Sequence, residues 1–273
     1  MSEGSELPGA WQASFTSIRE LSSFRSHQCE WIAETDSTND DLRSEWEQPL
    51  PKPRLRVAEH QRRGRGQFDR CWLDVAGKSL LFSFSWALTA HDDHRLPLSC
   101  LAGIALWQAL GQLIPHVSPS SWYLKWPNDL WNEQGKIGGI LVESSGSGSQ
   151  FDAIIGIGVN LSQVPILPGP VTGQLARAAA VDVSRYALLV AFCRQWDHLS
   201  RVRWSELITA YRSATSGMVG RRFDFHLPDT TSVSGTVRAI DDEGALIIED
   251  RVGARRVIRS LAQSPEEKET GRS

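Results

Sequence analysis

Cysteine is scarce in this sequence of 273 residues, and long hydrophobic runs are missing. The 4 cysteines lie far apart and form no Cys-x-x-Cys pair, which excludes a disulfide framework and a thiolate zinc site. No run of about 18 apolar residues is present, so no membrane-spanning helix is expected. The first residues, Met1 to Pro8, include two glutamates in place of a basic and then apolar signal sequence. We therefore expect a cytoplasmic protein without a membrane partner.

An excess of positive charge is also missing, because 29 lysines and arginines face 32 aspartates and glutamates. The net charge of -3 argues against a protein whose main partner is nucleic acid. The 7 histidines are scattered, apart from the pair in His91-Asp-Asp-His94. Two histidines in a polar loop are more often solvated than metal-bound, so we expect no metal site made by the protein alone.

The hydrophobic pattern divides the chain into parts. Residues 1–26 form an N-terminal arm with weak periodicity, too short for an independent DNA-binding domain. Residues 27–213 alternate short apolar strands with helical patterns, residues 214–264 contain only short strands, and residues 265–273 are a polar tail. The pattern predicts an α+β fold, in which helices cover a central β-sheet and a small β-barrel follows.

Two periodicities define the elements of this fold. The residues from Leu80 to Trp86 alternate as in a strand, whereas residues 98–113 repeat with helical spacing. The apolar runs Gly138–Val142 and Ala153–Val159 flank a Ser- and Gly-rich turn, which predicts adjacent strands. Helical spacing returns between Tyr186 and Tyr211. The strands expected for the barrel are Arg222–His226, Ser232–Ile240, Ala245–Glu249 and Arg255–Ile258.

An arginine- and glycine-rich segment runs from Gln61 to Trp72, directly before the first strong strand. Glycine permits close approach of the backbone to a ligand, and guanidinium groups are permanently charged donors that suit carboxylate and phosphate oxygens. The segment is therefore predicted to bind an anion. A solvated basic turn that contacts RNA is the alternative for this segment taken alone.

A second polar motif, Glu34-Thr-Asp-Ser-Thr-Asn39, precedes a short helical pattern. Such residues commonly cap a helix, with Ser37 and Asp40 in the positions of a capping box. The same helix N-terminus also presents free N–H groups and hydroxyls to a polar ligand. Both interpretations remain open at this point.

The third motif is Lys125-Trp-Pro-Asn-Asp-Leu130, followed by Lys136-Ile-Gly-Gly-Ile-Leu-Val-Glu143. It contains two lysines and a carboxylate close to strand ends. A half-buried lysine needs an anionic partner, because an unpaired charge is disfavoured in an apolar setting. A phosphate or carboxylate ligand would serve Lys136, although a surface lysine in a tight turn is the commoner case for a single lysine.

Together with Gly156-Ile-Gly-Val-Asn160, these motifs resemble the biotin-protein ligase family in order and spacing. The resemblance implies a biotin/lipoate ligase-like domain with a mixed sheet and a C-terminal SH3-like barrel. It also implies an enzyme that makes biotinyl-5'-AMP from biotin and ATP with Mg²⁺. The biotin then passes to a lysine of a biotin carboxyl carrier protein, a subunit of acetyl-CoA carboxylase. A homodimer is possible, and no DNA partner is expected.

The resemblance also assigns roles to residues. Lys136, Arg65 and Asp129 would be catalytic, with Lys136 contacting both biotin and phosphate oxygens. Asn128 would help Asp129 to place the nucleotide and the incoming amine, and Trp126 would add an apolar wall. The residues expected to bind biotin or the adenylate are Ser37, Thr38, Asn39, Gln61, Gly64, Arg65, Gly66, Gln67, Arg70, Trp72, Asn128, Lys136, Gly139, Gly156, Gly158 and Asn160.

One position departs from the family pattern. Where the loop usually reads Gly-Arg-Gly followed by a further arginine, this chain has Gln67, which is neutral. Arg62, Arg63 or Arg70 could compensate for the missing charge. The departure bears on how tightly the adenylate is held more than on fold or substrate class.

Three alternatives remain. Lipoate-protein ligases and octanoyl transferases share the fold, although the arginine- and glycine-rich loop favours biotin. A ligand-sensing repressor would need an N-terminal winged helix-turn-helix, for which the residues before Glu34 leave no space. A non-catalytic biotin-binding protein is suggested by Gln67, but the retention of Lys136, Asp129 and Arg65 favours an enzyme.

Overall fold

The computed structural model describes residues 7–45, 53–67, 70–89, 98–118, 121–147, 150–163, 182–226 and 232–259. A seven-stranded sheet forms the centre, in the order β1-β2-β5-β9-β8-β7-β6. Only β1 and β2 pair in parallel, and the other neighbours are antiparallel, so the sheet is mixed. Its strands are β1 Gln28–Thr35, β2 Arg54–Gln61, β5 Ser79–Thr89, β6 Trp122–Lys125, β7 Asp129–Asn132, β8 Gly135–Ser147 and β9 Gln150–Asn160.

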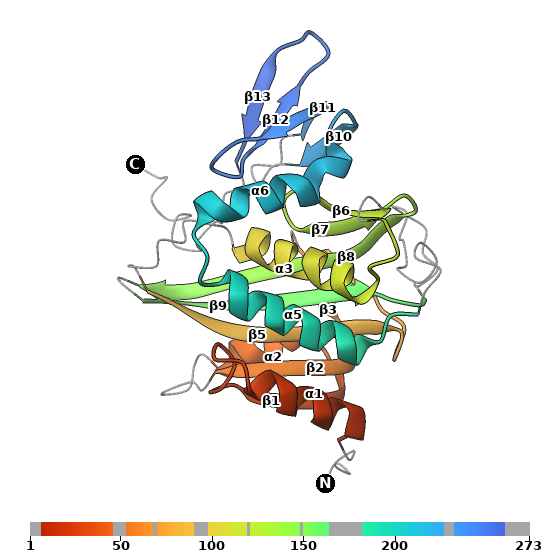
Figure 1. Ribbon diagram of the computed structural model, residues 1–273, viewed down its shortest axis with the longest axis vertical. Coiled ribbons are helices and arrows are strands. Elements are labelled where there is room, and N and C mark those ends of the chain that lie inside the picture. Colours follow the sequence, from red (N-terminus) through yellow and green to blue (C-terminus); the bar gives the residue numbers. More distant parts are fainter. Residues whose placement is uncertain are drawn as a thin grey trace.

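The helices lie on both faces of this sheet (Figure 1). The face in view is covered by α3, α5 and α1, whereas α2 lies behind the strands and contacts β2, β5 and β9. The central α+β architecture predicted from the periodicity is therefore confirmed. The helices are α1 Gly9–Arg19, α2 Thr38–Glu45, α3 Leu98–Leu113, α5 Arg185–Leu199 and α6 Trp204–Thr215.

Alternation along β5 explains how one strand serves both layers. Phe82 and Phe84 project toward α5, where their rings contact Phe192 at centroid distances of 5.2 and 6.0 Å. Ser83 lies between them in sequence and therefore projects to the opposite face, where it contacts α2. The apolar face packs the core, and the polar face is left for other contacts.

Helix α1 was not expected from the sequence, in which residues 1–26 show only weak periodicity. Trp11, Phe15 and Ile18 are nevertheless buried on one side of it, with helical spacing. The Trp11 ring lies 4.4 Å from that of Tyr186 in α5. This part of the arm is packed on the domain that follows it.

The C-terminal strands form an open four-stranded sheet, in the order β10-β11-β12-β13. The predicted strands are present, but their closure into a barrel is not confirmed, because β10 and β13 remain at opposite edges of the described sheet. Met218, in the 3-10 helix η2 Ser216–Met218, is fully buried where this sheet joins the larger one. The strands are β10 Arg222–His226, β11 Ser232–Ile240, β12 Leu246–Glu249 and β13 Arg255–Ile258.

Two sequence features fall outside the described residues: the His91-Asp-Asp-His94 pair and the polar tail at 265–273. Among the residues that are described, no helix is both long and apolar enough to cross a membrane.

Candidate active site

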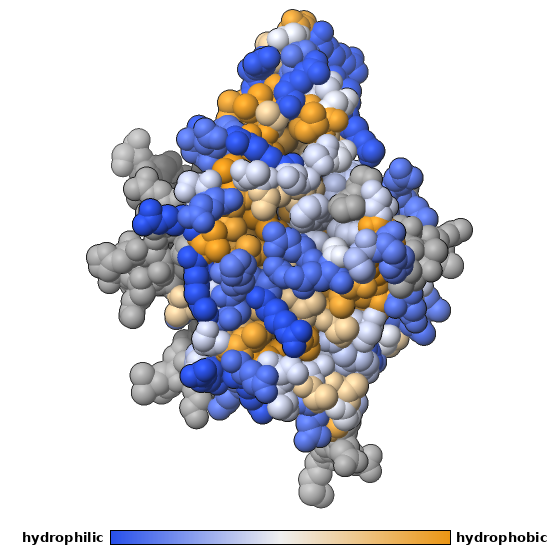
Figure 2. Space-filling view, viewed as in Figure 1, coloured by the Kyte–Doolittle hydropathy of each residue, from blue (hydrophilic) through white to orange (hydrophobic). Residues whose placement is uncertain are grey.

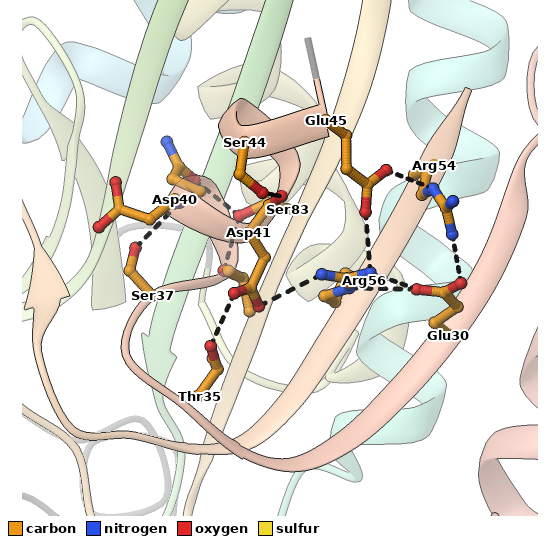
Figure 3. A network of polar contacts seen from close by, with 12 residues as sticks. Glu30, Thr35, Ser37, Asp40, Asp41, Ser44, Glu45, Arg54, Arg56 and Ser83 are labelled. Atoms are coloured by element: carbon orange, nitrogen blue, oxygen red, sulfur yellow. Dashed lines mark hydrogen bonds and ion pairs between the residues drawn. The ribbon is translucent and has the colours of Figure 1, made fainter. Parts of the chain in front are cut away.

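The site begins at α2, which a charged network fixes against β1 and β2 (Figure 3). Asp41 of α2 accepts a hydrogen bond from the Thr35 hydroxyl at 2.9 Å and lies 3.5 Å from the Arg56 guanidinium. Glu45, at the end of α2, pairs with Arg56 at 3.1 Å and also with Arg54. The C-terminal half of α2 is thereby anchored, which sets the position of its N-terminal residues.

The N-terminal end of α2 contributes to a floor of neutral polar side chains, defined here as Thr38, Asn39, Gln61 and Ser83. Gln61 Oε1 accepts from the backbone N–H of Thr38 at 2.8 Å and from its hydroxyl at 3.0 Å. The Thr38 and Ser83 hydroxyl oxygens are 2.6 Å apart, and Ser83 Oγ is 2.6 Å from Asn39 Oδ1. All four residues are buried, and burial is tolerated because each is hydrogen-bonded.

The floor has one acceptor to spare. A chain of three contacts runs from Gln61 Oε1 through the hydroxyls of Thr38 and Ser83 to Asn39 Oδ1. The two hydroxyls supply only two protons for these three contacts, so one contact lacks a hydrogen bond. One oxygen in this chain can therefore accept a hydrogen bond from a ligand N–H. The floor is suited to a neutral ligand group with N–H donors.

Glycines on β9 and β8 lack a side chain, and residues of the floor and of one wall occupy the space that a side chain there would fill. A Cβ on Gly156 would lie 2.0 Å from Asn39 Oδ1, and one on Gly158 would lie 2.6 Å from the Trp72 ring. A Cβ on Gly139 would lie 3.1 Å from Lys136 Nζ. These glycines were expected to leave room for the ligand, but at Gly156 and Gly158 the nearest occupants are side chains of the site itself.

A rim of charged side chains surrounds the floor, defined here as Arg65, Asp129, Lys136 and Glu143. Lys136 Nζ forms an ion pair with Asp129 at 2.7 Å and lies 5.8 Å from the centre of the Trp72 ring. About a third of its side chain is exposed, so the ammonium remains hydrated and can exchange partners. Asn128, next to Asp129, donates to the Ile140 carbonyl at 2.6 Å and fixes the backbone there.

Arg65 links the loop to both α2 and β8. Its guanidinium contacts Asp40 at 2.6 Å and Glu143 at 3.0 Å, and Glu143 in turn accepts from Asn39 Nδ2 at 2.8 Å. Burial opposes the charge of Arg65, but the carboxylates of Glu143 and Asp40 outweigh it and raise the pKa of the guanidinium. These contacts draw the loop toward the floor.

Lys125 adds a further cation beside the rim. Its ammonium lies 4.4 Å from the centre of the Trp131 ring and 5.5 Å from that of Phe223 in β10. Burial lowers the pKa of Lys125; Asp129 opposes this effect, while Lys136 and Arg70 lower the pKa further. Several cations thus converge near one carboxylate, an arrangement that favours the binding of a polyanion.

A cavity that is open to solvent, with about 460 Å³ of empty space including that solvent, is lined by three residues of the floor, by the Trp72 wall and by the Arg65 and Lys136 side chains of the rim. The structure brings together most of the residues predicted for the site. Those that line the cavity are Ser37, Thr38, Asn39, Gln61, Arg65, Gly66, Gln67, Trp72, Asn128, Lys136, Gly139, Gly156 and Gly158.

Besides Trp126, four predicted residues do not line this cavity. Asp129 is reached only through its ion pair with Lys136. Gly64 and Arg70 line a neighbouring cavity that is open to solvent and shares Arg65. Asn160 is buried at the end of β9, where it accepts a hydrogen bond from Ser79 at 3.4 Å.

Trp126 was expected to be an apolar wall of the site, and this expectation is wrong. Its indole N–H donates to the Gly244 carbonyl at 3.0 Å, and its ring meets Phe225 at a centroid distance of 6.2 Å. The cis peptide bond to Pro127 belongs to the same turn. Trp126 therefore joins the central sheet to the C-terminal sheet.

Some residues of the site were not predicted from the sequence. Ile140, Leu141 and Ile157 line the cavity, and Ser83 completes the floor. Ser83 could have been found, because a serine inside an apolar strand lies on the face opposite the phenylalanines. The three aliphatic residues gave no such signal, since apolar residues are expected throughout the core.

Comparison with known proteins identifies the class first. The model of the biotin/lipoate A/B protein ligase family matches residues 31–160. The structure of biotin protein ligase from Aquifex aeolicus in complex with biotin and ATP has a TM-score of 0.68 at 23% identity, over 85% of this chain and 96% of that one. This similarity is one of fold.

Sequence relatives then narrow the assignment. The biotin–[acetyl-CoA-carboxylase] ligase of Mycobacterium tuberculosis is 33% identical, over 85% of this chain and 86% of the relative. The ligase of the same name from Paracoccus denitrificans is 34% identical, over 83% of this chain and 96% of the relative. The chain therefore belongs to the biotin–[acetyl-CoA-carboxylase] ligases within the biotin/lipoate ligase family.

Proposed function

We propose that this enzyme joins biotin to ATP to form biotinyl-5'-AMP and then transfers biotin to a lysine of a biotin carboxyl carrier protein of acetyl-CoA carboxylase. The observation that carries the proposal is the division of one cavity into a neutral, hydrogen-bonding floor and a charged rim. Biotin has the matching halves: a neutral ureido ring with N–H donors and a carboxylate at the end of an aliphatic chain. The floor would bind the ring, and the rim would bind the carboxylate.

The rim supports the first step. A biotin carboxylate oxygen attacks the α-phosphorus of ATP, a P–O bond to the β-phosphate breaks, and pyrophosphate leaves. Negative charge accumulates on the phosphate oxygens, where Lys136 and Arg65 would stabilise it electrostatically. Both cations have carboxylate partners in this structure, and phosphate oxygens would compete for them.

A magnesium ion would supply further charge neutralisation for the phosphates. Within the described ranges, His, Cys, Asp and Glu do not gather in groups of three or more that could bind a metal ion by themselves. Mg²⁺ needs no such group, because it usually takes one or two carboxylates and completes its shell with phosphate oxygens and water. Asp129, or the pair Asp40 and Glu143 that meets at Arg65, offers those carboxylates.

In the second step, the neutral amine of the acceptor lysine attacks the biotinyl carbonyl, an amide bond forms, and AMP leaves with the electron pair of the broken C–O bond. Before attack, Asp129 can hold the lysine in its ammonium form once Lys136 engages the substrate, and this ammonium loses one proton to water to give the neutral amine. After attack, the nitrogen loses a second proton, which the Asp129 carboxylate can accept. Closure of the loop that carries Arg65 would exclude water from the mixed anhydride.

The C-terminal sheet is proposed to be the SH3-like unit of residues 214–264, following the catalytic region of 27–213. Figure 2 shows hydrophobic residues interspersed among hydrophilic ones on this unit. We propose that the unit helps to dock the carrier protein, since Phe223 of β10 lies beside Lys125 at the edge of the site. We place the reaction in the cytoplasm, where ATP is available. The enzyme is proposed to act without a DNA partner, and a homodimer is compatible with this function.

The experiment is to incubate the protein with ATP, Mg²⁺ and either biotin or lipoate, and to detect acyl-AMP by mass spectrometry. Biotinyl-AMP with biotin, and no lipoyl-AMP with lipoate, is the expected result. Lipoyl-AMP alone would assign the chain to lipoate chemistry instead. Biotin binding without any adenylate would indicate a binding protein and overturn the proposal.

A further inference from the structure

Asp74 closes the base of the arginine- and glycine-rich loop. The loop leaves β2 after Gln61, folds back through the short pairing of β3 (Gly64–Arg65) with β4 (Cys71–Trp72), and reaches Asp74. The Asp74 side chain has no exposed surface. Its Oδ1 accepts from the Gln61 backbone N–H at 3.2 Å, and its Oδ2 lies 2.9 Å from His60 Nδ1. The carboxylate thus joins the two ends of the loop.

The backbone explains why a carboxylate is needed at this position. Pairing between β2 and β5 ends at Ala58 with Leu81, so the end of β2 continues beyond its β5 neighbour. The N–H of Gln61 would be costly to leave unpaired in a buried setting. Asp74 supplies the acceptor, and His60 supplies a second donor that stabilises the buried carboxylate.

Both residues next to this connection belong to the cavity. Gln61 extends its side chain to Thr38 in the floor, and Trp72, just before Asp74 in the chain, lies over Gly158 as the wall. A shift of the Asp74 contacts would therefore move the floor and the wall relative to each other.

We propose that Asp74 and His60 are a positioning pair, which sets the spacing between the Gln61 floor and the Trp72 wall and so determines how tightly the biotin ring is bound. Neither residue lines the cavity, so the pair acts through Gln61 and Trp72. The inference rests on the proposed function for the identity of the ligand, but the effect on the loop itself does not.

The test compares three variants. Asp74→Leu removes both acceptors at similar size. Asp74→Asn keeps an oxygen for the Gln61 N–H and offers an amide donor to the other His60 tautomer, so it should rescue. Asp197→Leu is the matched control for Asp74→Leu, because Asp197 also accepts a backbone N–H, from Ser23 at 2.7 Å, and a side-chain donor, from Arg201 at 2.6 Å. Asp197 lies on α5 and connects it to the segment after α1, away from the loop.

Two readouts are taken on each folded variant: the dissociation constant for biotin, and deuterium uptake by the segment 62–73. Asp74→Leu should weaken biotin binding roughly 10-fold or more and speed uptake, whereas Asp74→Asn should stay within roughly 3-fold of wild type. Asp197→Leu should change neither readout, even if its unfolding midpoint falls as much as that of Asp74→Leu.

Unchanged affinity and uptake in folded Asp74→Leu would overturn the inference, as would equal effects of the Asp197 control. If Asp74→Leu does not fold, His60→Leu, which removes one of the two donors, is the replacement and should show the same changes at smaller size. A wild type that does not bind biotin would instead refute the proposed function, and deuterium uptake would still decide whether Asp74 positions the loop.

Discussion

The floor of the cavity and its rim adjoin in space, where Asn39 donates to Glu143, but are built from different chemistry. Thr38, Asn39, Gln61 and Ser83 are buried and uncharged, and each forms hydrogen bonds within the protein, with one acceptor left for a ligand. Lys136 and Arg65, by contrast, keep about a third of each side chain exposed and have carboxylate partners. Burying an unpaired charge costs far more than burying a hydrogen-bonded amide or hydroxyl, which explains why the charges remain at the edge.

This difference separates two tasks. A pre-formed neutral floor can select a ligand by hydrogen-bond pattern, because its donors and acceptors are already fixed. A rim of exchangeable ion pairs can respond to charge that develops during the reaction. Variants of the floor should therefore change mainly biotin affinity, and variants of the rim should change mainly the rate of adenylate formation.

The largest effect is expected at the rim. Lys136→Ala should fold normally but form biotinyl-AMP roughly 10 to 150-fold more slowly, because a hydrogen bond to a charged group contributes about 1.5 to 3 kcal/mol. The measurement is single-turnover formation of labelled adenylate. Lys78→Ala, at an exposed lysine before β5, is the control. A rate unchanged from wild type would remove Lys136 from the reaction.

A floor variant should have the opposite signature. Thr38→Val keeps the size of the side chain but deletes the hydroxyl that contacts both Gln61 and Ser83. Biotin binding should weaken roughly 10 to 30-fold, with a smaller change in the rate at saturating biotin. Calorimetry and saturation kinetics separate the two, and Thr16→Val on the exposed side of α1 is the control. A purely kinetic effect would contradict the division of tasks.

How much of this could be predicted from sequence differs between fold and site. Alternation in β5 predicted the strand and its core face, because one side of it is uniformly apolar. Helix α1 was not predicted, although Trp11, Phe15 and Ile18 have helical spacing, because the polar residues around them resemble a linker. The barrel was not confirmed, since strand patterns show where strands occur but do not determine how the edges of a sheet meet.

The site was predictable where a motif is local and unpredictable where contacts are distant. The residues Gln61, Lys136 and Trp72 line the same cavity; polar and cationic neighbours in sequence predicted an anion near them, and the family resemblance supplied their individual roles. Trp126 belongs to the same motif as Asn128, yet its partner Phe225 lies far along the chain, so its role at the C-terminal sheet could not be seen. Asp74 gave no signal, because its importance depends on the backbone N–H of Gln61.

Gln67 tests whether the rim holds the intermediate as well as forming it. It lines the cavity beside Arg65, where the family pattern has a further arginine. Gln67→Arg should add a charge-assisted contact to the adenylate, of order 1 to 2 kcal/mol, and slow its escape by roughly 5 to 30-fold.

The measurement is a chase of preformed labelled adenylate with unlabelled biotin and ATP. The wild type should also label added lysine-rich protein less selectively than the variant. Gln67→Lys is a useful companion, because a point charge without a planar fork should slow escape less. Equal escape rates for wild type and Gln67→Arg would mean that Arg65 and its neighbours already supply enough charge.

The smallest effect tests, at a titratable side chain away from the ligand, whether burial in this fold disfavours the charged form. His27 is buried, and its Nε2 lies 2.9 Å from the Ser85 carbonyl, to which it donates. Burial lowers the pKa of His27 below its ordinary value of 6.5, against the opposing effect of that hydrogen bond. As the pH falls through 6.5, the unfolded chain takes up the proton first, so the free energy of unfolding should decrease.

His27→Gln keeps a donor for Ser85 but cannot be protonated in this range, so its loss of stability on acidification should be smaller. Denaturant unfolding of both proteins at pH 7.5, 6.5 and 5.5, near the reference pKa of histidine, measures the difference. Parallel curves would show that His27 is protonated as easily in the folded chain as in the unfolded one, and that burial does not disfavour charge at this position.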